Sequence, residues 1–306
     1  FIEPTQKPYT VTTYRGVIKN HLKPNLGAVR LCDLTTEQVQ KMVRKLVKAK
    51  LAPKTIKNIM TVLNSALEQA VKAQTLQRNP AKYAKIPAVR VKEIHTFTIQ
   101  EIADFVDAAQ DSPYYAPLMC CLFLGLREGE ALGLAWEHVN FENGNVLICQ
   151  QLQKEKSKGG KFYIQEGTKN GQNRVLDVPD FLLEILKDEK QHQLLAHLSA
   201  GPAWQNVWGL CFTDALGQCI NPHTLWINFK RIAASIGLPD ARVHDLRHTN
   251  ATLALVNGDD LKTVQANLGH ATAAFTLQRY VHASEAMKRA SANRMQQFFD
   301  DNVKKA

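Results

Sequence analysis

The chain has 306 residues, of which 45% are hydrophobic and 22% are charged, a composition typical of one large globular domain or two of ordinary size. No apolar run has the length of a membrane span and no secretory leader is visible, so we expect no membrane partner. The six cysteines show no sign of disulfides, and we therefore expect a reducing cytosol as the compartment. The net charge of +10 is uneven, because residues 1–92 hold 18 Lys and Arg against 4 Asp and Glu, a net of +14, while the remaining 214 residues carry a net of −4.

The one-sided charge of residues 1–92 is typical of a module that binds a polyanion, most simply nucleic acid, although a single lysine run is more often a solvated face. Apolar stripes at helical spacing predict helices over residues 35–50 and 53–74, and a shorter helix is expected around Thr10 to His21. The first stripe comprises Val39, Met42, Val43, Leu46 and Val47. Packing of the stripes leaves five lysines outside, where they can lie along phosphates: Lys41, Lys45, Lys48, Lys54 and Lys57.

A linker is predicted next, because the stretch from about Asn79 to His95 has two prolines and several cations but no helical stripe. A new helix begins after Thr98, which can cap its first turn, with Glu101 at the reciprocal position of a capping box. We therefore divide the chain into a helical domain over residues 1–85, a basic linker over residues 86–97 and a larger domain over residues 98–306.

The larger domain is predicted to mix helices with a small antiparallel sheet. Residues 117–126 are almost wholly apolar and predict a buried helix. Residues 145–151 are strand-like, and residues 161–179 predict two strands joined by a turn at Asn170-Gly171. Helices follow, among them one over residues 221–237 that starts Asn-Pro and ends in Gly. The predicted fold class is α+β: a small all-helical domain followed by a larger, mainly helical domain with a small antiparallel sheet.

The stretch HDLRHTNATL, residues 244–253, gathers His244, Arg247 and His248 on one helical face. A metal site would use the two histidines as an i, i+4 pair, but the adjacent Glu and an obvious third ligand are missing, and Arg247 repels a dication. The six cysteines show no CxxC spacing that could supply a zinc site. A phosphate site explains more, because the planar guanidinium suits phosphodiester oxygens and a histidine at a helix start adds a donor.

Other chemically capable side chains stand at unusual places, and each has an ordinary explanation when taken alone. Arg127 interrupts an apolar helix, where Glu130 can orient it or simply form a buried ion pair with it. Lys169 lies at the predicted turn, where lysines are usually solvated. His270 follows a helix that ends at Gly269, and Tyr280 would most often be half-buried core.

The order and spacing of these residues are more specific than any one of them. The series Arg127, Lys169, HDLRHT from residue 244, LGH from residue 268, and Tyr280 ten residues after His270 resembles the tyrosine recombinases, also called the phage integrase family. The resemblance covers about Thr98 to His282, and the basic helical segment fits the core-DNA-binding domain of that family.

The resemblance implies a role for each matching residue. Tyr280 is the expected nucleophile, and Arg127 and Arg247 are expected to clamp the scissile phosphate. His244 and His270 are further hydrogen-bonding partners, and Lys169 is the expected acid that protonates the departing 5′-oxygen. Two residues are given supporting roles: His248, and Glu130 as the residue that orients Arg127.

The chemistry of phosphoryl transfer agrees with these roles. Its transition state spreads negative charge over the phosphate oxygens, so fixed cations can take the place of metal ions. A free tyrosine has a pKa of about 10, so attack needs a cationic site or a base, for which His244 is the candidate. A covalent 3′-phosphotyrosine conserves the energy of the phosphodiester bond. We therefore expect neither a metal nor a nucleotide cofactor.

Two alternatives concern function. A type IB topoisomerase relaxes DNA with similar chemistry, and a catalytically silent DNA-binding protein lacks the reaction altogether. Within the family, the start at Phe1 rather than Met indicates that an arm-binding domain has been removed, which favours an integrase of a phage or conjugative transposon over a compact chromosome resolvase. Such a protein is expected to act in the cytoplasm on the bacterial nucleoid.

The expected partners are double-stranded DNA at specific recombination sites, further copies of this chain and accessory proteins. The tail over residues 285–306 carries an apolar stripe of Ala286, Ala290, Met295, Phe298 and Phe299. We expect it to pack against a neighbouring subunit in a DNA-assembled dimer or tetramer, with packing against its own domain as the alternative.

Overall fold

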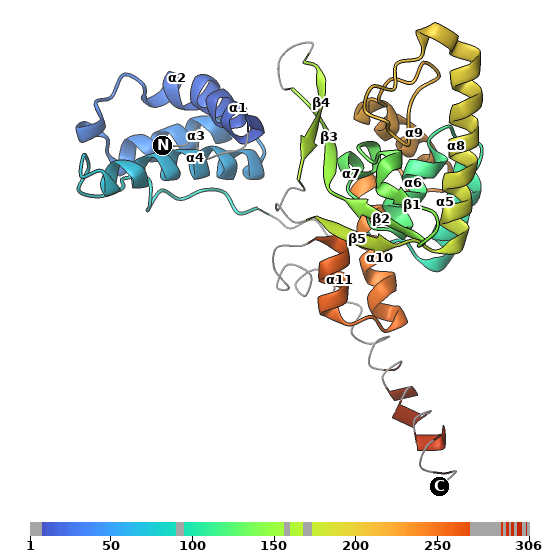
Figure 1. Cartoon of the computed structure of the whole chain (residues 1–306). Coiled ribbons are helices and arrows are strands. Elements are labelled where there is room, and N and C mark those ends of the chain that lie inside the picture. The colour runs from blue at the N-terminus through green and yellow to red at the C-terminus, as the bar shows by residue number, and fades with distance from the viewer. Residues whose placement is uncertain are drawn as a thin grey trace. The chain divides into compact units, whose positions relative to one another are not determined.

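The computed structural model describes residues 8–89, 95–155, 160–167 and 173–269, and near the C-terminus residues 289, 292, 293, 295, 296, 299–301 and 304. Figure 1 shows its helices and strands. The chain divides into two compact units between Glu93 and Ile94, and each unit has a hydrophobic core of its own. Within the described ranges, no helix is long and apolar enough to cross a membrane.

The first unit consists of helices, as the sequence predicts. They are α1 (Pro8–Val17), a π-helical turn η1 (Ile18–Leu22), α2 (Lys23–Leu26), a 3-10 turn η2 (Leu31–Asp33), α3 (Thr36–Lys48) and α4 (Pro53–Lys72). Thr35 caps α3, because its hydroxyl accepts from the Gln38 amide and the Gln38 side chain accepts from the Thr35 amide. Pro53 opens α4 at the position where its missing N–H leaves no helical bond unmade.

The core of the first unit is formed by the apolar stripes of α3 and α4. The predicted stripe of α3 is buried apart from Val47, which is 46% exposed. The prediction for Val47 was wrong, because the residue lies one position round the helix from Leu46 and faces solvent. All five lysines expected outside the core are exposed: Lys41, Lys45, Lys48, Lys54 and Lys57.

The stretch that follows α4 packs on the first unit at its beginning. Asn79 is buried, and its side chain donates to the Glu68 carboxylate at 2.7 Å. The hydroxyl of Thr36 donates to the carbonyl of Pro80 at 2.8 Å, and Ala81 lies in the core. The extended stretch therefore begins as part of the helical unit and becomes a connection only further along.

The second unit begins with three helices, α5 (Ile99–Ala109), α6 (Tyr115–Phe123) and α7 (Glu128–Leu132). The capping box predicted for α5 is present, since Thr98 and Glu101 exchange both hydrogen bonds. Phe97 packs in the core of this unit, and its amide donates to the Thr249 hydroxyl at 2.9 Å. Helix α6 is almost completely buried, as its apolar sequence predicts.

Two small antiparallel sheets follow. In the first, strands β1 (Val139–Asn140), β2 (Asn145–Ile148) and β5 (Arg174–Asp177) lie in the order β1-β2-β5. In the second, β3 (Gln150–Lys154) pairs with β4 (Phe162–Glu166). The α+β class is thus confirmed, with the sheet in two parts (Figure 1).

The prediction that the two strands within residues 161–179 form one hairpin was wrong. Both strands exist, but β4 pairs back with β3, and β5 pairs with β2, where Leu176 stands opposite Val146. Both of these residues are buried. Burial of Leu176 against the core thus decides the pairing of β5, and the local turn signal does not.

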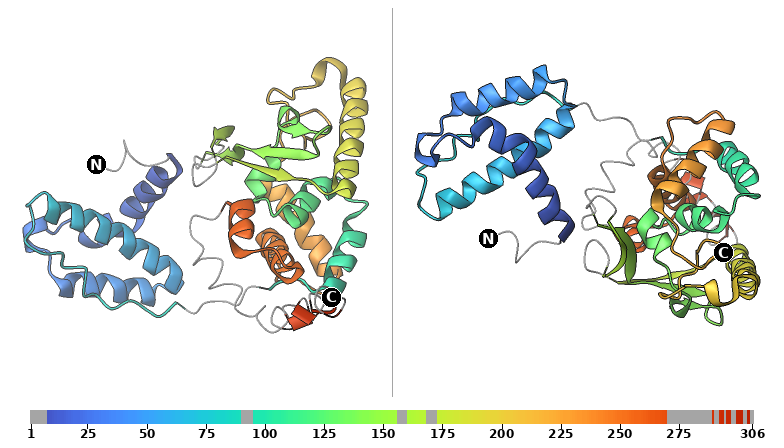
Figure 2. Two further views of the ribbon diagram at one scale, coloured as in Figure 1. Left: turned by 60° about the horizontal axis from the view of Figure 1, so that its bottom comes forward. Right: turned by 90° about the horizontal axis from the view of Figure 1, so that it is seen from above.

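The chain continues as α8 (Asp180–Ala200), a 3-10 turn η4 (Gly201–Ala203), α9 (Pro222–Ser235), α10 (Val243–Asn257) and α11 (Leu261–Leu268). Helix α8 lies along the outside of this unit in both views of Figure 2. Helix α10 packs on α6 and α11, so that the buried α6 lies directly beside the stretch that begins at His244. The predicted start of α9 at Asn221-Pro222 is confirmed, because the Asn221 side chain caps it.

Candidate active site

The sequence indicated that Arg127 lies inside one apolar helix, and this was wrong. Arg127 lies in a turn between two helices, α6 and α7. Helix α6 ends at Phe123, and Gly125 then adopts a φ of +60°, a conformation that favours glycine. Arg127 precedes the first residue of α7 and is extended. Its Nη2 donates to the carbonyl of Gly269 at 3.1 Å, and 20% of its side chain is exposed. The turn thus presents this guanidinium partly to solvent.

Glu130 is the buried centre of the site, with a fully buried side chain. Its carboxylate accepts from Arg127 Nη1 at 2.5 Å and from Arg174 Nη2 at 2.7 Å, and Arg247 Nη1 lies 3.7 Å away. Burial alone would raise the pKa of this carboxyl, but the hydrogen bond from Arg174 and the charges of the three arginines lower its pKa to about 2. Glu130 is therefore ionised and holds three guanidinium groups together.

Arg247 reaches this centre from α10 and is almost completely buried. Its Nη1 donates to the carbonyl of Gly125 at 2.6 Å, and its Nη2 donates to the carbonyl of Leu268. A charge at this depth is costly unless it is paired, and the Glu130 carboxylate supplies the opposite charge. The arginine of the HDLRHT stretch is thus part of the cluster and not a solvated helical residue.

His244 and His248 stand one turn apart on α10, with ring centroids 4.6 Å apart and the rings edge to face. His248 is buried, whereas His244 keeps an exposed side. Desolvation, followed by the charges of Arg247 and Arg127, lowers the pKa of His244 to about 4. His244 is therefore neutral at pH 7 and offers an uncharged imidazole beside the arginines.

The remaining polar residues at the start of α10 fix its position. Asp245 pairs with Arg242 at 2.7 Å, and the Asn250 side chain donates to the carbonyl of Phe123 at 3.0 Å. Thr249 accepts from the amide of Phe97. Within the described residues, no three His, Cys, Asp or Glu side chains gather as a metal site. This run of polar residues ties α10 to the Gly125 turn and to the start of the unit.

Arg174 is a member of the cluster that we did not predict. It opens β5, its side chain is 8% exposed, and it binds Glu130 and the carbonyl of Asn267. A signal was present, since the alternation of a strand puts Arg174 on the same face as the buried Leu176. An arginine on the inward face of a strand needs a buried partner, but the sequence does not identify Glu130 as that partner.

Three of the predicted site residues, Lys169, His270 and Tyr280, lie outside the described residues. The described ones, namely Arg127, Glu130, His244, Arg247 and His248, come together from α7, the turn before it, and α10. Together with Arg174 they form what we call the arginine cluster: three guanidinium groups around one carboxylate. Its formal charge is +2, which suits an anion such as a phosphodiester.

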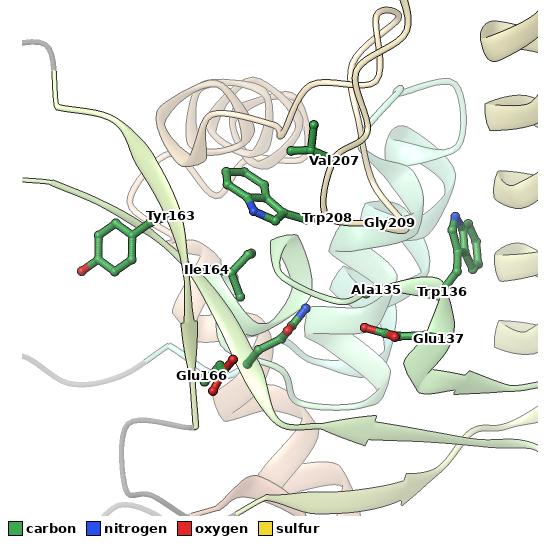
Figure 3. Close-up of a pocket in the computed structure, with 10 residues that line it drawn as sticks. Ala135, Trp136, Glu137, Tyr163, Ile164, Glu166, Val207, Trp208 and Gly209 are labelled. Atoms are coloured by element: carbon green, nitrogen blue, oxygen red, sulfur yellow. The ribbon is translucent and has the colours of Figure 1, made fainter.

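A separate hollow of about 720 Å³ lies between the β3–β4 hairpin and the stretch before Leu210. Figure 3 shows Trp208 and Ile164 lining it from opposite sides, while Trp136 points away toward α8. Glu137 and Glu166 belong to the lining, and among the described residues that line the hollow there is no Lys or Arg. Two carboxylates without a cation do not suit a phosphate, so the arginine cluster and not this hollow is the candidate active site.

Comparison with known proteins identifies the family to which the sequence is similar. A family model described as the phage integrase family matches residues 92–287, and one described as the phage integrase N-terminal SAM-like domain matches residues 2–47. A tyrosine recombinase XerC-like protein of Caldanaerobacter subterraneus subsp. tengcongensis is 28% identical, over 97% of this chain and 80% of its own. The ICEBs1 integrase of Bacillus subtilis (strain 168) is 24% identical, over 96% and 79%.

A solved structure extends the comparison to the fold. The Tn1549 transposon integrase, in complex with a circular intermediate DNA, matches with a TM-score of 0.81 at 19% identity over 95% of each chain. The two chains therefore share a fold across both units.

Proposed function

The chain belongs to the phage integrase family and is a tyrosine recombinase, an enzyme of site-specific DNA recombination, and we propose that it works through a covalent bond between Tyr280 and a DNA 3′ phosphate. The observation that carries this proposal is the arrangement of Arg127, Arg174 and Arg247 around the buried Glu130. We propose that this reaction integrates and excises a mobile element. The family match favours recombination over simple relaxation of DNA or silent DNA binding.

In the proposed step, the phenolic oxygen of Tyr280 attacks the scissile phosphorus. The new P–O bond forms as the bond to the 5′-oxygen breaks, and Lys169 gives that oxygen its proton. Arg127 and Arg247 stabilise the charge on the non-bridging oxygens. Rejoining reverses these events with the 5′-hydroxyl of another strand, so the energy of the phosphodiester is conserved and neither a metal nor a nucleotide is required.

His244 and His270 complete the scheme as hydrogen-bonding partners, and His248 supports His244 through their ring contact. Because its pKa is about 4, His244 is unprotonated at pH 7 and can accept the phenolic hydrogen of Tyr280. A bound phosphate brings negative charge next to the same arginines that lower this pKa. The basicity of His244 should therefore rise when DNA is bound.

The nucleophile can be tested with a nicked duplex that traps the covalent product. Tyr280→Phe should bind this duplex with near-normal affinity and form no adduct, because the variant lacks only the phenolic oxygen. The measurement is denaturing gel electrophoresis beside a fluorescence anisotropy titration. An adduct that survives in this variant would remove Tyr280 from the role.

The partners follow from the same proposal. Double-stranded DNA at specific sites is the substrate, and copies of the chain assemble on paired sites as a dimer or tetramer, with accessory proteins as further partners. We place the contact between subunits in the tail, residues 285–306. In support of this, Met295 and Phe299 are 69% and 49% exposed, so their apolar surface is available to a neighbour.

The two parts of the chain have different proposed tasks. Residues 1–85 bind the DNA backbone, residues 86–97 connect, and residues 98–306 carry the reaction. The five exposed lysines of α3 and α4 and the net charge of +14 on residues 1–92 support the first of these assignments.

A further inference from the structure

Arg174 makes more contacts than a single ion pair requires. Its Nη2 donates to Glu130 Oε2 at 2.7 Å, and its Nη1 lies 3.4 Å from Glu130 Oε1. Its Nε donates to the carbonyl of Asn267 at 2.7 Å. The Nη1 and Nη2 groups of Arg174 therefore bind α7, and its Nε group binds the last turn of α11.

The end of α11 is held by all three arginines in turn. The carbonyl of Asn267 accepts from Arg174, that of Leu268 from Arg247, and that of Gly269 from Arg127. The last carbonyls of a helix have no helical partner and carry its negative dipole end, so guanidinium groups are suitable partners. The same three arginines surround Glu130, so α7 and the end of α11 are joined through one cluster.

Close approach at this point depends on Gly269. The residue has a φ of +61°, and a Cβ there would lie 3.2 Å from Arg174 Nη1. The left-handed conformation ends α11 while leaving room for the guanidinium group of Arg174. His270 is the next residue in the sequence and is joined to Gly269 by one peptide bond.

Arg174 itself is poorly placed to bind the phosphate. Its side chain is 8% exposed, against 20% for Arg127, and each of its three nitrogens donates to Glu130 or to the carbonyl of Asn267. A role in the reaction must therefore act through its neighbours.

We propose that Arg174 is a positioning residue for strand cleavage, which sets Glu130 against Arg127 and fixes the end of α11 from which His270 follows. The proposal rests on the proposed roles of Arg127 and His270. It also gives β5 a function, because Arg174 stands five residues after Lys169 in the sequence and links the strand that follows the acid to the phosphate-binding arginines.

The test uses the full chain and a nicked duplex at saturating concentration. Arg174→Gln should lower the rate of adduct formation roughly 10- to 100-fold, the range that corresponds to one charge-assisted hydrogen bond. The dissociation constant for DNA should stay within about threefold, because phosphate contacts elsewhere dominate affinity. Arg174→Lys should recover part of the rate, since an ammonium group can pair with Glu130 but does not reproduce the guanidinium fork.

A second substrate separates positioning from general damage to the fold. A methylphosphonate at the scissile position replaces one charged oxygen by a methyl group, so it needs the guanidinium groups less. The factor by which Arg174→Gln lowers the rate of adduct formation should therefore be smaller on the methylphosphonate duplex than on the ordinary duplex. A structural defect would reduce both rates by the same factor, and that result would overturn the proposal, as would an unchanged rate on the ordinary duplex.

Two further variants complete the design. Lys187→Gln removes an exposed ion pair with Glu184 in the same unit and should leave both rates unchanged. Tyr280→Phe must give no adduct on either substrate, so an adduct there rejects the proposed function and not the role of Arg174. Should Arg174→Gln melt below the assay temperature, the ratio of the two rates for Arg174→Lys decides the question in the same way.

Discussion

Glu130 determines how much positive charge the site can hold. Three guanidinium groups this close together repel one another, and the buried, ionised carboxylate of Glu130 compensates this repulsion. With a pKa of about 2, this carboxylate is ionised at neutral pH. The remaining charge of +2 is a standing attraction for phosphate, provided by the fold before DNA arrives.

A prediction about the leaving group belongs to this scale. Lys169→Ala should slow cleavage of an ordinary strand, because the departing 5′-oxygen then lacks its proton donor. A substrate with sulfur at the 5′-bridging position leaves without protonation and should restore most of the rate. Single-turnover adduct formation on the two substrates measures the difference. Equal defects on both would mean that Lys169 is not the acid.

The charge state of His244 gives a second prediction. In the free protein, the imidazole should titrate near pH 4, because desolvation and the charges of Arg247 and Arg127 disfavour its protonated form. In a complex of Tyr280→Phe with its DNA site, the midpoint should move upward, toward the usual value of about 6.5. Proton NMR of the imidazole ring follows both titrations, with His244→Gln to assign the signal. A midpoint near 6.5 in the free protein would contradict this account.

The sequence predicted the members of the site that match family motifs and missed the one that does not. Arg127 and Glu130 are three residues apart, so the possibility of their pairing is visible in the sequence. Arg174 is 44 residues from Glu130, and its role depends on how β5 enters the sheet, which the sequence does not reveal. The resemblance to the family identified the residues that match its motifs, among them Arg247, which is far from Arg127 in sequence, whereas Arg174 stands outside those motifs.

At the scale of elements, the features set by neighbouring residues could be predicted from the sequence, and the features set by distant residues could not. The capping box of α5 and the start of α9 at Asn221-Pro222 were predicted from the sequence because each depends on residues three or fewer positions apart. The partner of β5 was not predicted, because β5 pairs with β2 and not with β4, the nearest strand in sequence. Pairing across the intervening hairpin is decided by burial in the core, which is a property of the whole unit.

Helix α3 carries a prediction of its own. Lys41, Lys45 and Lys48 lie on one exposed face, so replacing all three by Gln should remove up to three phosphate contacts. The slope of log affinity against log salt should then fall by up to about 2.7, at about 0.9 for each contact. Anisotropy titrations over a range of salt concentrations measure the slope, and Lys187→Gln is the matched control on α8. An unchanged slope in the triple variant would show that α3 does not lie along the DNA backbone.

At the scale of the whole molecule, the uneven charge separates affinity from chemistry. The first 92 residues carry +14, while the rest of the chain carries −4 although it contains the arginine cluster. We therefore propose that electrostatic attraction to DNA is concentrated in the first unit, and that the second unit contributes a local anion site at the arginine cluster. In this proposal, the first unit holds the DNA while the cluster engages a single phosphate.

Recombination also requires several cleaved ends to be held together, so the subunits must recognise one another. The tail has apolar side chains at Met295 and Phe299 that are exposed in the single chain, and Ala286, Ala290 and Phe298 of the same predicted stripe lie outside the described residues. Because the tail follows Tyr280 in sequence, we expect a neighbour that binds the tail to influence the position of this proposed nucleophile. A tail that docks on a second copy therefore links assembly to cleavage.

Deleting residues 285–306 tests this link. The shortened protein should keep its melting temperature and its affinity for a single DNA site, but it should form no higher-order complex on paired sites, because the contact between subunits is gone. Native gel electrophoresis and light scattering follow assembly, and the nicked duplex follows cleavage, which should persist or rise if the tail restrains Tyr280 in the monomer. As a milder change, Met295→Ser with Phe299→Ser should weaken assembly without removing the helix. Normal assembly and recombination by the shortened protein would refute docking on a neighbour, and loss of its folded state would show instead that the tail closes its own domain.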